Sequence, residues 1–97
     1  MADVTPIGTK LNARREQVLH RLLEAQNAHD ADAAIACFAH PRYELVGNQR
    51  VYDGSAEVRH YYDVILRYFP DLQFEVIDLH HADDAVVAEV WMTGTHL

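Results

Sequence analysis

The sequence predicts an α+β domain in which helices pack on one face of an antiparallel sheet. Three segments carry apolar residues at the three- and four-residue spacing of amphipathic helices, and four shorter segments have the composition or alternation of β-strands. Their order along the chain is helix, helix, strand, strand, helix, strand, strand, so each pair of strands can form a hairpin. We expect residues 12–97 to form a single domain and residues 1–11, which show no periodicity, to form a flexible tail.

The first two helices are predicted over residues 12–29 and 31–39. The first has a single apolar stripe, formed by Val18, Leu19, Leu22, Leu23 and Ala25. Asp30 is well suited to be the N-cap of the second helix, because its carboxylate can accept a hydrogen bond from a backbone N–H of the first turn. Pro41 is expected to end that helix.

The third helix is predicted over residues 56–69, between an N-cap at Ser55 and the helix-breaking Pro70. Its apolar face is wide and includes two adjacent tyrosines, Tyr61 and Tyr62. Neighbouring residues of a helix point in different directions, so only one of these tyrosines can face inward.

Four strands complete the predicted domain. They are expected at residues 43–46, 50–52, 72–80 and 85–95. The third strand alternates, which places on one face Leu72, Phe74, Val76 and Asp78. Ile77 and Leu79 then lie on the opposite, outer face. Because that face is too apolar for a monomer, we expect a homodimer.

The final strand is apolar on both faces between Ala85 and Thr93, and the sequence ends soon afterwards at Leu97. A strand of this kind needs cover on both faces and a neighbour along each edge. We therefore expect a C-terminally incomplete domain, whose sheet is completed by a partner chain or by further residues of a longer protein.

The composition excludes several classes of partner. The 97 residues carry a net charge of −7, which argues against binding to nucleic acid or to an anionic membrane. No apolar run is long enough for a membrane span, and the first residues lack a signal-peptide pattern, so a cytoplasmic protein is expected.

Cysteine and histidine usage argues against metal sites. Cys37 is the only cysteine, which excludes an intrachain disulfide and a thiolate zinc site, and we interpret it as a small hydrophobic side chain rather than a nucleophile. His80 and His81 are adjacent in a strand and point to opposite faces, so they cannot easily share one ion. We therefore predict no metal and no cofactor.

Several short motifs resemble those of a known family. They are Ala25–Asp32 between the first two helices, Phe38-Ala39, Tyr52-Asp-Gly54, Phe69-Pro-Asp-Leu72 and Gly94-Thr-His96. With this order of helices and strands, the chain resembles the SnoaL-like polyketide cyclase and ketosteroid isomerase-like branch of the NTF2-like superfamily. The resemblance implies a half-cone, in which three helices wrap the concave side of a curved sheet around a pocket. It also implies acid–base chemistry on carbons activated by a carbonyl group, as in aldol ring closure or double-bond migration.

The resemblance directs attention to particular positions. Leu22 and Val46 stand where the steroid isomerases have their oxyanion-hole tyrosine and their base, so isomerisation by that mechanism is not supported. Glu44, on the same strand face as Val46, is the nearest carboxylate that could act instead. His96 matches the motif histidine of the cyclases, whose acid–base aspartate lies on a later strand, beyond Leu97.

The predicted catalytic residues are His96, Asp78 and Glu44. Each has a structural alternative: a capping contact for His96, a partner across the sheet for Asp78, and an exposed strand position for Glu44. The predicted ligand-binding residues lie on the first and third helices and the long strands, and are Leu22, Tyr62, Phe74 and Trp91. Plain packing in the core or at an interface is the alternative for the aromatic residues among them.

The leading hypothesis is a small-molecule-binding protein with isomerase-, cyclase- or dehydratase-type activity on a hydrophobic, polyketide- or steroid-like ligand. The alternative is a non-catalytic binding or assembly module, whose sheet is completed by a partner chain. Both hypotheses stay open at the level of the sequence.

Overall fold

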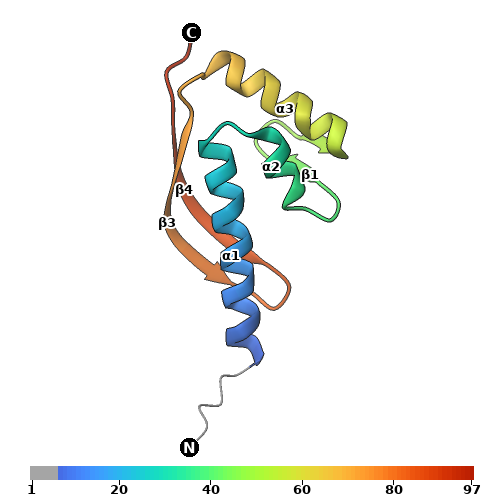
Figure 1. Ribbon diagram of the computed structural model, residues 1–97, viewed down its shortest axis with the longest axis vertical. Coiled ribbons are helices and arrows are strands. Elements are labelled where there is room, and N and C mark those ends of the chain that lie inside the picture. The colour runs from blue at the N-terminus through green and yellow to red at the C-terminus, as the bar shows by residue number, and fades with distance from the viewer. Residues whose placement is uncertain (1–6) are drawn as a thin grey trace, which may run out of the picture.

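The computed structural model describes residues 7–97 and has the predicted order of helices and strands (Figure 1). Its elements are α1 (Ile7–Asn27), α2 (Ala31–Ala36), β1 (Arg42–Leu45), β2 (Arg50–Asp53), α3 (Ser55–Tyr68), β3 (Gln73–His81) and β4 (Val86–Thr93). The α+β class is therefore confirmed. Helix α1 begins at Ile7, so the part of the expected tail between residues 7 and 11 is helical, whereas residues 1–6 lie outside the described residues.

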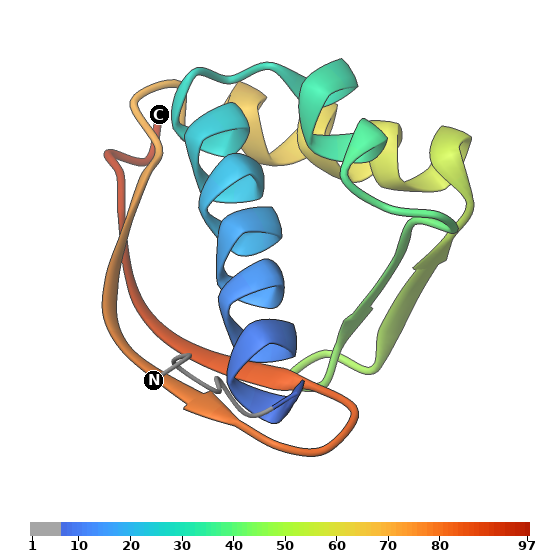
Figure 2. The ribbon, with the colours of Figure 1, turned by 60° about the horizontal axis from the view of Figure 1, so that its bottom comes forward.

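The strands form two antiparallel hairpins, β1–β2 and β3–β4, rather than one continuous sheet, within residues 7–97. Figure 2 shows the two hairpins on opposite sides of α1, with the long β3–β4 hairpin curving around that helix. Helices α2 and α3 pack on each other near the C-terminal end of α1. None of the helices in the described part of the chain is both long and apolar enough to cross a membrane.

The α1–α2 corner is built as the sequence predicts. Asp30 is the N-cap of α2, and its Oδ1 accepts a hydrogen bond of 3.1 Å from the N–H of Ala33. The residue before it, His29, has a left-handed backbone (φ 58°), which reverses the chain direction between the two helices. Helix α2 ends at Ala36, three residues before the predicted end.

Helix α3 begins differently from the prediction. Gly54 is the N-cap, and Ser55 is the first helical residue, so the expected cap by the Ser55 side chain is wrong. Gly54 has φ 91° and ψ 165°, a combination that is accessible to glycine and strained for other residues. Its N–H donates to the Pro41 carbonyl at 2.8 Å, which joins the end of the β1–β2 hairpin to the segment before β1.

The hydrophobic core is small and lies where the three helices meet. Its buried members are Ala25, Ala34, Val58 and Tyr62, and the half-buried Leu22, Ile35, Tyr43 and Tyr61 pack around them. Alanines at the α1–α2 contact let the two helices approach closely, and Val58 of α3 is completely buried against them.

A β-bulge changes the expected facing of residues in β3. Val76 pairs with Val90, but the next pair is Asp78 with Glu89, which leaves Ile77 without a partner in β4. An extra residue in one strand reverses the alternation beyond it. Leu79, rather than Asp78, therefore lies half-buried on the same face as Phe74 and Val76. The prediction that Asp78 shares that face is wrong, as is the placement of Leu79 on the outer face.

The β3–β4 hairpin is attached to α1 at two places, near the middle of the helix and at its C-terminal end. Near the middle, the guanidinium of Arg15 donates to the carbonyls of Ala82 and Asp83 in the hairpin turn, at 2.9 and 2.8 Å. At the C-terminal end, the side-chain amide of Asn27 donates to the Phe74 carbonyl at 3.0 Å and accepts from the Phe74 N–H at 2.7 Å. These contacts fix the path of β3 along the helix.

Candidate functional site

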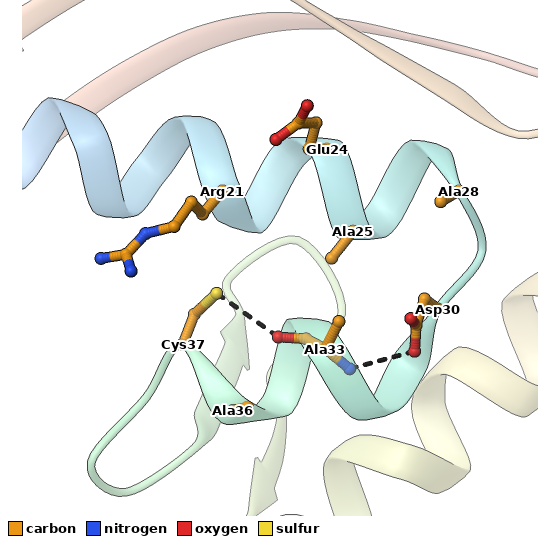
Figure 3. A pocket seen from close by; sticks show the side chains of 8 residues that line it. All are labelled: Arg21, Glu24, Ala25, Ala28, Asp30, Ala33, Ala36 and Cys37. Atoms are coloured by element: carbon orange, nitrogen blue, oxygen red, sulfur yellow. Dashed lines mark hydrogen bonds between the residues drawn. The ribbon is translucent and has the colours of Figure 1, made fainter.

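One open groove lies between α1 and α2 and has a volume of about 640 Å³ (Figure 3). Alanines from both helices line it together with Arg21, Glu24, Asp30 and Cys37. The Asp30 carboxylate is used as the helix cap, and the Cys37 thiol donates to the Ala33 carbonyl at 3.4 Å. Cys37 thus has a local structural contact, and this groove offers no histidine among its lining residues.

A second cleft, which we call the aromatic cleft, has a different chemical character. It encloses about 310 Å³ between α3, the β1–β2 hairpin and the C-terminal segment, and is lined by Leu45, Asn48, Tyr52, Tyr61, Val64, Ile65, Tyr68, Phe69 and His96. Four of these residues follow one stripe of α3 at three- and four-residue spacing, namely Tyr61, Val64, Ile65 and Tyr68. The cleft combines aromatic faces with an imidazole and three phenol hydroxyls.

His96 lies against the C-terminal end of α3. Its ring stacks on Tyr68, with centroids 5.7 Å apart and an interplanar angle of 17°. It is also tilted against Phe69, with centroids 5.2 Å apart. The imidazole therefore packs on two aromatic rings at the edge of the cleft.

The structure distinguishes the two adjacent tyrosines of α3. Tyr62 is buried, with 5% of its surface exposed, and its hydroxyl accepts a hydrogen bond of 2.8 Å from Nε2 of Gln26 and is hydrogen-bonded to the Tyr43 hydroxyl. Tyr61 lines the aromatic cleft, where its ring lies 5.1 Å from that of Tyr52. Tyr61, and not the predicted ligand-binding residue Tyr62, lines the aromatic cleft.

Burial raises the pKa of three phenols in and around the core. Desolvation raises the pKa of Tyr43, Tyr61 and Tyr62, and the neighbouring phenols raise the pKa of Tyr43 and Tyr61 further. A protonated phenol is a hydrogen-bond donor, so the hydroxyl of Tyr61 can donate to an acceptor atom in the cleft at neutral pH.

Three predicted ligand-binding residues lie away from the aromatic cleft. Leu22 packs against the core and borders an open groove of about 560 Å³ between α1 and the start of β4. Phe74 shares with Tyr62 a cavity of only about 10 Å³, which has room for no more than one water molecule. Trp91 lies on the outer face of β4, opposite Glu75, and is 63% exposed.

The two predicted carboxylates also lie elsewhere. The Glu44 side chain is 56% exposed and accepts a hydrogen bond of 3.0 Å from Arg42 on the same face of β1. The Asp78 side chain is 61% exposed on the outer face of β3, because of the bulge at Ile77. Neither carboxylate lines the aromatic cleft.

Asp78 belongs to a cross-strand cluster with His80 and Glu89. His80 Nε2 is 2.9 Å from Glu89 Oε1 and 3.5 Å from Asp78 Oδ2. Such donors are of a type that binds divalent metals, but all three residues are exposed to solvent, as in an ordinary surface ion pair. His81 points to the opposite face and contacts Glu16 of α1 at 3.5 Å, so the two histidines do not share a site.

Comparison with known proteins gives the family. The family described as SnoaL-like domain matches residues 19–97. The chain belongs to the SnoaL-like domain family. This confirms the resemblance to the SnoaL-like branch of the NTF2-like superfamily that the sequence motifs indicate. No curated protein matches the chain.

Two solved structures are similar to the chain. AclR, a proposed hydroxylase from Streptomyces galilaeus, is 26% identical with a TM-score of 0.69, and the match covers 87% of this chain and 62% of AclR. A SnoaL-like protein of unknown function from Burkholderia thailandensis is 27% identical with a TM-score of 0.69, over 80% of this chain and 72% of that protein. The chain thus spans less than two thirds of the length of AclR.

The raised pKa of Tyr43 predicts that stability falls as the pH rises above about 10. The unfolded chain loses the Tyr43 proton near the ordinary pKa, whereas the folded chain retains it, so ionisation favours the unfolded state at high pH. Urea unfolding between about pH 8 and 11 should show this loss, and Tyr43→Phe should show a shallower decline. The exposed Tyr68→Phe serves as a control with the wild-type slope. Equal slopes for wild type and Tyr43→Phe would contradict the prediction.

Proposed function

We propose that the aromatic cleft binds a small, planar, hydrophobic molecule and that His96 carries out acid–base chemistry on it. The observation that carries this proposal is the imidazole of His96, stacked on Tyr68 within a cleft that also contains Tyr61. Membership of the SnoaL-like family supports a small-molecule-binding role at the level of the family.

The size and lining of the cleft suit a compact ring system. Its volume of about 310 Å³ lies at the lower end of the range for small-molecule sites. The side chains of Leu45 and Ile65 supply apolar contact, and the rings of Tyr61 and Tyr68 supply faces on which a planar ligand can stack. The Tyr61 hydroxyl can orient a ligand that has a carbonyl or hydroxyl oxygen.

The chemistry that we propose is proton transfer at a carbon next to a carbonyl group. A histidine can take up and return a proton near neutral pH, so His96 can remove the proton from that carbon. The Tyr61 hydroxyl, which its raised pKa keeps protonated, can donate to the carbonyl oxygen and stabilise the negative charge that develops there. Isomerase-, cyclase- and dehydratase-type reactions all begin with such a step. Glu44 and Asp78 have no part in this proposal, because neither lines the cleft.

Binding can be tested with 2-naphthol, a fluorescent molecule of two fused rings with one hydroxyl. We expect His96→Ala and Tyr61→Phe to raise its Kd by about three- to tenfold, because each removes one aromatic or hydrogen-bond contact. His80→Ala is the matched histidine control and Tyr62→Phe the matched tyrosine control, provided that circular dichroism shows each to be folded. A Kd unchanged in both cleft variants, or no binding to the wild type, would contradict the proposed site.

The acid–base step can be tested with 2-tetralone, whose hydrogens next to the carbonyl exchange slowly with D₂O. We expect the wild-type chain to accelerate this exchange, followed by NMR, and His96→Ala to lose most of the acceleration, on the order of 10²-fold. Glu44→Gln and Asp78→Asn should retain the wild-type rate. Acceleration that persists in His96→Ala, or that depends on Glu44, would overturn the role of His96.

The exposed edge of β4 favours a second candidate function, an assembly module. Within residues 7–97, β4 pairs only with β3, and Val87, Trp91 and Met92 are each more than half exposed. A strand from a partner chain could pair with the open edge and cover these side chains. Native mass spectrometry of protein from its own host should then show a stable complex, a homodimer included, that Met92→Lys weakens. A chain that stays monomeric at all concentrations would contradict this candidate.

A further inference from the structure

Two motifs that are distant in the sequence meet in the structure. Phe69-Pro-Asp-Leu72 follows α3, and Gly94-Thr-His96 follows β4. The Asp71 carboxylate accepts a hydrogen bond of 2.7 Å from the N–H of Thr95. Two residues later, the N–H of Leu97 donates to the Tyr68 carbonyl at 3.1 Å. The backbone is therefore held on both sides of His96.

Glycine at position 94 permits this close approach. A Cβ built on Gly94 would lie 3.2 Å from Cβ of Phe69 and 3.3 Å from its Cδ1, which is tighter than ordinary van der Waals contact. A side chain at this position would require Phe69 or the C-terminal segment to shift by a few tenths of an ångström. Gly94, Asp71 and Phe69 of the two motifs therefore all take part in the contact between the C-terminal segment and the end of α3.

Asp71 itself makes no contribution to the hydrophobic core. It is exposed, and the hydrogen bond from the Thr95 N–H is the main reason why its pKa lies below the ordinary value. The ring of His96, one residue further along the chain, lies on Tyr68 and Phe69 and faces the aromatic cleft. The exposed carboxylate of Asp71 thereby holds the backbone of Thr95, which directly precedes His96.

We propose that Asp71 is a positioning residue, which holds the 94–97 segment so that the imidazole of His96 lies over the aromatic cleft. This inference rests on the proposed function for the importance of His96, but not for the contact itself. Without the carboxylate, the Thr95 N–H would bond to water, and His96 would be held only by its own stacking and by the Leu97 N–H. A histidine that moves relative to the cleft loses effective contact with a bound ligand.

The test compares Asp71→Ala with Asp71→Asn in the full chain. NMR of the ligand-free protein should show nuclear Overhauser contacts between the rings of His96 and Tyr68 in the wild type, and should show them lost in Asp71→Ala. Asp71→Asn should restore them, because its Oδ1 can accept the same N–H. Asp78→Ala, which removes another exposed carboxylate, is the control with wild-type contacts. Gly94→Ala gives a second variant, in which the contacts should be weakened although Asp71 is intact.

The same variants separate this inference from the proposed function. We expect Asp71→Ala to weaken 2-naphthol binding about three- to tenfold, as His96→Ala does, with recovery in Asp71→Asn. Ring contacts that persist in Asp71→Ala overturn the positioning role, whatever the binding result. Ring contacts that are lost while the wild type fails to bind 2-naphthol support the positioning role and contradict the binding function.

Discussion

The side-chain amide of Asn27 joins the helical part of the fold to its long hairpin. One side chain satisfies both the N–H and the carbonyl of Phe74, as a neighbouring strand would. The contact is reciprocated, since Nε2 of Gln73 donates to the Asn27 carbonyl at 3.2 Å. Because Asn27 ends α1, this pairing sets where β3 begins and in which direction it runs. The position of the returning β4, and of the 94–97 segment beside α3, follows from it.

The features that the sequence predicts well depend on local chemistry. Helix periodicity, the cap at Asp30 and the end of α3 before Pro70 all involve residues within one or two turns of each other. The bulge at Ile77 could not be predicted in this way, because it arises from the register between β3 and β4, and glycine does not mark it. Its effect is large, since every side chain beyond it in β3 changes face, Asp78 included.

The residues of the candidate site are only partly predictable from the sequence. His96 could be selected from its motif, and the α3 stripe that contains Tyr61 is visible as a helical repeat. The sequence does not distinguish Tyr61 from Tyr62, because adjacent residues on a broad apolar face cannot be ranked without knowing what packs against them. Glu44 and Trp91 lie in strands, and both are exposed although they are predicted to belong to a pocket. Alternation separates the two faces of a strand, but the rest of the fold decides which face is covered.

The location of Trp91 has a consequence for spectroscopy. It is the single tryptophan of the chain, and it lies exposed on the outer face of β4, whereas three of the five tyrosines line or border the aromatic cleft. Indole emission therefore reports on events at the outer face of the β3–β4 hairpin, and phenol emission reports on the cleft together with the core that contains Tyr43 and Tyr62. Excitation at two wavelengths can follow these two regions of one unlabelled chain separately.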